Sequence, residues 1–132
     1  MRPILTALAL TAALSAPALA QEPMSGAEFD AYTSGKTLLF GTGGDVYGGE
    51  DYLPGRRVRW SFLDGRCLDG VWYEDGPFIC FVYDDDPAPV CWTFYRGPAG
   101  LRAYLDGDPA EVLYETGEAD EPLLCLGPEV GV

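Results

Sequence analysis

The chain has 132 residues and a formal net charge of −13, because 21 acidic residues outweigh eight lysines and arginines. A chain this acidic repels nucleic acids and anionic membrane surfaces, so we exclude nucleic-acid binding. Histidine is absent, which removes the commonest general base and a frequent zinc ligand. We therefore expect no metal site and no cofactor.

The first twenty residues are typical of a secretory signal peptide. Arg2 precedes an apolar run over residues 4–14, and Ala-Leu-Ala at positions 18–20 forms an A-x-A cleavage site. The run is shorter than the roughly 20 apolar residues that span a bilayer. We predict that residues 1–20 are a signal peptide and that residues 21–132 form one domain. Arginine strongly outnumbers lysine, as in GC-rich bacterial genomes, so the expected location is periplasmic or secreted from a bacterium, without membrane insertion.

The mature chain is expected to begin with one short helix. Ser25 and Glu28 have the spacing of a capping box, and Gly35 stands where a helix would end. The pattern predicts a helix over residues 26–34, followed by a first strand over residues 36–40.

Residues 41–55 contain six glycines and Pro54. This composition predicts a long loop, and loops of such length often carry function. Tyr47 and Tyr52 are its candidate anchors. The next residues, 58–62, alternate apolar and polar side chains and predict a half-buried strand.

The rest of the chain is read as a meander of short strands. Asp-Gly pairs at 64–65, 69–70, 75–76 and 106–107 are turn signals. The strands between the turns are expected near residues 70–74, 77–83, 90–96, 101–105, 110–116 and 123–126. Short antiparallel strands at regular spacing predict an all-β fold, a small meander barrel or sandwich.

The segment from 78 to 95 reads as a hairpin with two distinct faces. Ile79, Phe81 and Trp92 belong to the face that is plainly core, whereas Cys80 and Cys91 share the other face. Four cysteines in an exported chain without a CxxC pair favour disulfides over zinc. We predict the bond Cys80–Cys91 from the shared face. By elimination, the second bond joins Cys67 to Cys125 and ties the C-terminal segment to the domain.

The pattern Gly70-Val-Trp72, Gly76, Ile79-Cys80-Phe81 and Cys91-Trp92 resembles small exported alphaproteobacterial proteins, grouped as domains of unknown function. The resemblance covers residues 58–105 and implies a lipocalin-like β-barrel, but no activity. The additional cysteines and the glycine-rich segment depart from the family pattern.

Two charged clusters are candidate sites. Asp84-Asp85-Asp86 lacks the alternating ligands and glycine of a calcium loop and reads as a solvated hairpin tip. Four of the basic residues lie close together, and their outward members are expected to pair with neighbouring carboxylates or to form a partner site. The candidate binding surface comprises Tyr47, Tyr52, Arg56, Arg57 and Arg59.

No catalytic residues stand out, so the leading interpretation is a disulfide-stapled module without enzymatic activity. It would bind an unknown periplasmic or extracellular protein, for example as an inhibitor of a basic hydrolase, since opposite charge speeds association. The alternative is a small-ligand carrier with an aromatic barrel interior, although side chains usually fill a barrel this small. The third is a cell-wall hydrolase that uses paired carboxylates.

Overall fold

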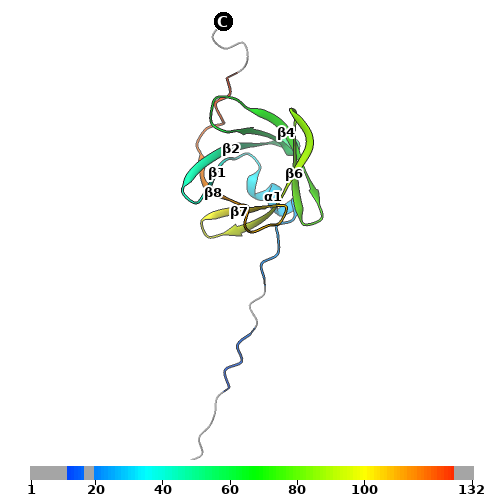
Figure 1. Cartoon of the computed structure of the whole chain (residues 1–132), viewed down its shortest axis with the longest axis vertical. Coiled ribbons are helices and arrows are strands. Elements are labelled where there is room, and N and C mark those ends of the chain that lie inside the picture. Colours follow the sequence, from blue (N-terminus) through cyan, green and yellow to red (C-terminus); the bar gives the residue numbers. More distant parts are fainter. Residues whose placement is uncertain (1–11, 17–19, 127–132) are drawn as a thin grey trace, which may run out of the picture.

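The computed structural model describes residues 12–16 and 20–126 (Figure 1). Most of the predicted signal peptide lies outside the described residues. The domain is a closed barrel in which each strand pairs antiparallel with the next and β1 pairs with β8. The predicted all-β meander is therefore confirmed, and of the two architectures considered it is the barrel. No helix in the described part of the chain is long and apolar enough to cross a membrane.

The elements follow the meander order expected from the sequence. They are α1 (Gly26–Thr33), β1 (Thr37–Thr42), β2 (Asp45–Leu53), a 3-10 turn η1 (Pro54–Arg56), β3 (Arg57–Ser61), β4 (Leu68–Asp75), β5 (Phe78–Tyr83), β6 (Asp86–Gly97), β7 (Gly100–Leu105) and β8 (Val112–Ala119).

Helix α1 begins at the predicted capping box. The Ser25 hydroxyl accepts from the Glu28 amide at 3.2 Å, and the Glu28 carboxylate accepts from the Ser25 amide at 3.1 Å. The helix lies within the outline of the barrel in Figure 1. Its Phe29 is fully buried and meets the rings of Tyr52 and Trp72 edge-on, with centroids 5.6 and 5.1 Å apart. Because apolar burial of a Phe is strongly stabilising, this contact fixes the helix across one end of the barrel.

We call that end, which carries the turns around residues 54–56, 76–77 and 98–99, the closed end. Three backbone amides tie the N-terminal segment and α1 to it. Met24 donates to the Phe94 carbonyl at 2.7 Å, Gly35 donates to the Tyr52 carbonyl at 2.9 Å, and Gly26 donates to the Glu74 carboxylate. The opposite, open end carries the turns around residues 43–44, 62–67, 84–85 and 106–111.

The predicted loop over residues 41–55 is wrong. Residues 43 and 44 form a tight turn with positive φ angles of 73° and 148°, which glycine adopts without strain, and β2 follows at once. Gly41, Gly48 and Gly49 make room for neighbours: a Cβ at Gly48 would clash with the Trp60 ring. Gly55 has a positive φ of 75° within η1. Glycine in this stretch therefore reflects close packing within strands and two separate turns, and a high glycine count alone does not distinguish these from a loop.

Two further expectations are corrected. Asp69-Gly70 is not a turn but lies inside β4, where Gly70 leaves space for the Tyr83 ring. Residues 123–126 form no strand. They run as an irregular segment, the C-terminal strap (residues 121–126), which the disulfide and a few backbone contacts hold in place.

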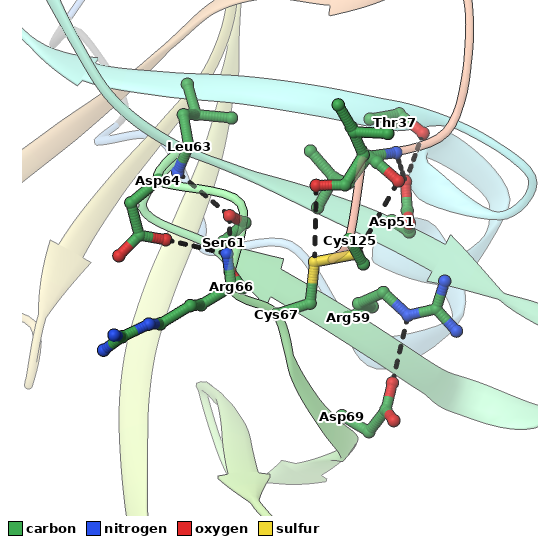
Figure 2. Close-up of a disulfide and its surroundings, with 12 residues drawn as sticks. Thr37, Asp51, Arg59, Ser61, Leu63, Asp64, Arg66, Cys67, Asp69 and Cys125 are labelled. Carbon is green, nitrogen blue, oxygen red and sulfur yellow. Dashed lines mark hydrogen bonds and ion pairs between the residues drawn. A yellow bond between two sulfur atoms is a disulfide. The ribbon is translucent and has the colours of Figure 1, made fainter. Parts of the chain in front are cut away.

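Both disulfides join the cysteines that the sequence predicted. Cys80 and Cys91 face each other directly across β5 and β6, with Cα atoms 4.0 Å apart, the close spacing typical of a non-hydrogen-bonded pair. Cys67 and Cys125 have Cα atoms 5.5 Å apart and join the start of β4 to the C-terminal strap (Figure 2). Disulfides are consistent with an oxidising compartment outside the cytoplasm.

Candidate functional site

The interior of the barrel is only partly filled. Alternate side chains of each strand point inward, and between α1 and the open end they line a cavity of about 240 Å³ that opens to solvent. Its walls are predominantly apolar and aromatic. The lining residues are Phe40, Tyr47, Glu50, Tyr52, Trp60, Phe62, Leu68, Phe81, Tyr83, Val90, Trp92, Phe94, Ala103 and Leu113.

Three aromatic side chains form a mouth cluster at the open end. The centroids of Tyr47, Trp60 and Phe62 lie 5.4 to 6.0 Å from one another. Tyr47 and Phe62 are about half exposed, at 49% and 52%. An aromatic surface thus continues from the solvent into the cavity, which is a route by which an apolar molecule could enter.

Deeper in the cavity wall lies a buried carboxyl group. Glu50 is 3% exposed, and its Oε2 accepts a hydrogen bond of 2.7 Å from the hydroxyl of Tyr83. Its other oxygen, Oε1, is buried and has no hydrogen-bond partner among the described residues. Buried polar groups are normally satisfied, so an unpartnered carboxyl oxygen in a cavity wall requires an explanation.

Burial changes the proton affinity of this site. The pKa of Glu50 is raised to about 8, chiefly because burial removes its hydration. The hydrogen bond from Tyr83 lowers this pKa, and the negative charge of Asp51 raises it. The pKa values of Tyr83 and Tyr52 are also raised, chiefly by burial and then by the nearby Glu50. At neutral pH the cavity wall therefore carries a largely protonated carboxyl group beside two neutral phenols.

The strand that carries Glu50 is braced from outside the barrel. Its neighbour Asp51 points to the outer face, where Oδ1 accepts from the Thr37 hydroxyl at 2.6 Å and from the Leu123 amide at 3.1 Å (Figure 2). The latter bond comes from the C-terminal strap, which Cys125 secures. The strap therefore fixes β2, and with it the position of Glu50.

The structure separates the five residues of the candidate binding surface. Tyr52 is 3% exposed and lies inside the barrel, so it is not a surface residue, and Tyr47 belongs to the mouth cluster. Arg56 lies at the closed end with its guanidinium over the Trp72 ring. Arg59 forms an ion pair with Asp69 at 3.1 Å on the outer face, which is the pairing with a neighbouring carboxylate considered from the sequence. Arg57 is exposed nearby.

The aspartate run is a hairpin tip. Asp84 and Asp85 form the turn before β6, and the Asp86 carboxylate accepts from the Ala88 amide at 2.9 Å. Within the described residues, no group of three or more histidine, cysteine, aspartate or glutamate side chains is arranged to hold a metal ion.

Sequence reasoning missed Glu50, the one acidic residue of the cavity lining. Its signal was present in the alternation of Gly48, Glu50 and Tyr52, which places all three on one strand face. The glycines and Pro54 around it predict a loop instead, which masks the alternation. The aromatic interior, by contrast, was anticipated from the Phe81 and Trp92 face of the hairpin.

Comparison of the chain with protein-family models, with curated proteins and with solved structures found no match.

Proposed function

We propose that this protein binds a small apolar molecule inside its barrel. The observation that carries the proposal is the cavity of about 240 Å³ with aromatic walls and one unpartnered polar group. Ligand sites have this composition: apolar surroundings with a small number of placed polar groups. A cavity of 150 Å³ already holds benzene, so this one suits one or two fused rings with a short substituent.

The closed end and the open end support a carrier in different ways. Phe29 closes one end with a fully buried ring, while Tyr47 and Phe62 leave apolar surface at the other. A ligand would enter the barrel between Tyr47 and Phe62 and would be stopped by helix α1 at the closed end. The protein-interaction module favoured by the sequence relied on the acidic charge and on a tyrosine–arginine surface whose members lie apart in the structure. The aromatic cavity supports the small-ligand alternative instead.

We infer that the carrier works outside the cytoplasm, in the periplasm or after secretion. The two disulfides support this, since such bonds persist in oxidising compartments. The signal-peptide pattern of residues 1–20 supports it independently.

Isothermal titration calorimetry with indole tests the proposal, because indole is neutral, bicyclic and small enough for the cavity. We expect saturable binding at one site. Ala103→Leu fills part of the cavity and should weaken binding at least about fivefold, which corresponds to about 1 kcal/mol. The matched control is Ala99→Leu, at an exposed position of the closed end, and it should bind as the original chain does.

Circular dichroism establishes whether each variant folds. If Ala103→Leu does not fold, Leu113→Phe provides the same test from another part of the wall. Absence of indole binding by the intact protein, or unchanged binding by a folded cavity-filling variant, would show that the barrel interior is not the site.

A further inference from the structure

Glu50 gives the cavity a chemical preference beyond apolarity. Its side chain is almost completely buried and lines the cavity, with one oxygen bound to Tyr83 and the other without a partner. A carboxylate accepts hydrogen bonds only. The partner that its ionised form lacks among the described residues is therefore a donor, and a ligand in the cavity can supply one.

The groups around Glu50 offer no positive charge to its ionised form. Its cross-strand partners are Leu38 on β1 and Trp60 on β3, neither of which can ionise. Tyr83 from β5 and Tyr52 from its own strand are neutral phenols, and Asp51 behind it carries the same sign of charge. No lysine or arginine is among the described residues that line the cavity.

The aromatic walls favour a cation over an anion. Phe81 and Tyr83 lie nearly parallel, with ring centroids 6.3 Å apart, and the faces of such rings attract ammonium groups. The net charge of −13 draws cations toward the protein and repels anions. A carboxylic acid would also meet Glu50 directly, whereas an amine would meet a matching acceptor.

We propose that the ligand is a hydrophobic amine, whose ammonium group binds the Glu50 carboxylate while its aromatic or aliphatic body fills the cavity. This inference rests on the proposed function, since it names the ligand class of the same site. In the complex, the ammonium donates to Oε1, and Tyr83 continues to donate to Oε2. Both oxygens of the buried carboxylate then have hydrogen-bond donors.

Amine binding must displace the proton that Glu50 holds in the empty cavity. Because the pKa of Glu50 is about 8, the affinity for an ammonium ion should rise with pH by up to about tenfold per unit between pH 6 and 8. It should then level off until the amine itself loses its charge. A carboxylic acid ligand would show the opposite trend.

A series of indoles that differ only at the end of one side chain tests this inference. Tryptamine carries an ammonium group, tryptophol a hydroxyl group and indole-3-propanoate a carboxylate. In calorimetric titrations at pH 8, we expect tryptamine to bind at least about tenfold more tightly than tryptophol, and indole-3-propanoate to bind weakest. Titrations at pH 6.5 in buffers of different ionisation heat should show release of about one proton per tryptamine bound.

Glu50→Gln removes the carboxylate with little change in shape. It should weaken tryptamine binding at least about tenfold, abolish the proton release and leave tryptophol within about threefold. Glu22→Gln makes the same chemical change at an exposed position of the closed end and should change none of these values.

The outcomes separate the two proposals. If tryptophol binds as tightly as tryptamine, with no proton release in the intact protein, the amine preference is wrong while the carrier function stands. If none of the three indoles binds, the carrier function fails as well. The proton-release measurement needs no variant, so it remains decisive even if Glu50→Gln does not fold.

Discussion

The two ends of the barrel are built from the same strands but differ in what their aromatic residues do. At the closed end, Phe29 packs against four other rings and is inaccessible to solvent. At the open end, Tyr47 and Phe62 contact each other yet remain half exposed. An aromatic-rich sequence can thus supply both a packed core and a lined cavity within one small barrel, and helix α1 packs at the core end.

The largest expected effect comes from removing the ring that closes the barrel. Phe29→Ala should lower the free energy of unfolding by roughly 3–5 kcal/mol, because it leaves a large void among rigid rings. Phe62→Ala at the open end should cost less than about 1 kcal/mol, since half of that side chain is already exposed. Urea denaturation of both variants measures the contrast, and similar losses at the two positions would contradict it.

The disulfides offer a second contrast. Cys67–Cys125 closes a loop with a sequence separation of 58, and Cys80–Cys91 one with a separation of 11. The chain-entropy model assigns them about 4 and about 3 kcal/mol. Replacing both cysteines of the longer loop by alanine should therefore destabilise the protein more, as measured by thermal unfolding. The reverse order would mean that the packing of the fully buried Cys80, rather than loop length, dominates.

A smaller effect is expected from the pH dependence of stability. Burial raises the pKa of Glu50 above its ordinary value of 4.5 to about 8, so between these values the folded protein holds a proton that the unfolded chain has lost. Stability from this group is complete below about pH 4.5 and is lost as the pH rises through 8. Relative to Glu50→Gln, the original chain should lose about 2–3 kcal/mol between pH 5.5 and 7.5. Chemical denaturation at both pH values checks this, with Glu22→Gln as control; a constant difference would show that Glu50 titrates normally.

Much of the fold followed from local patterns whose physics is short-range. The capping box at Ser25 and Glu28 located the helix, and the alternation along residues 78–95 gave both the core face and the Cys80–Cys91 bond. Local sequence patterns do not predict the structure where a residue's role depends on a neighbour that is distant in sequence. Only glycine fits at position 48, because the ring of Trp60 on the next strand occupies the space of a Cβ. The residues around position 48 do not reveal that this ring packs against them.

The site was less accessible than the fold for a related reason. Acidic residues are expected at the surface, so nothing in the glycine-rich stretch singles out Glu50 or Asp51 as buried. Their burial depends on Tyr83 inside the barrel and on Leu123 outside it, both remote in sequence. The positions of the arginines were likewise anticipated only in part, because Arg56 turns toward Trp72 at the closed end.

Closure of the barrel also has a kinetic consequence. Thr37, at the start of β1, pairs with Ala119, at the end of β8, so the first strand keeps one unpaired edge until nearly the whole domain has been synthesised. Folds dominated by such distant pairings cross their transition state slowly. Exposed strand edges invite association with other chains in the meantime. The folding of this protein is therefore expected to be limited by the meeting of its first and last strands, and to be most vulnerable to aggregation before they meet.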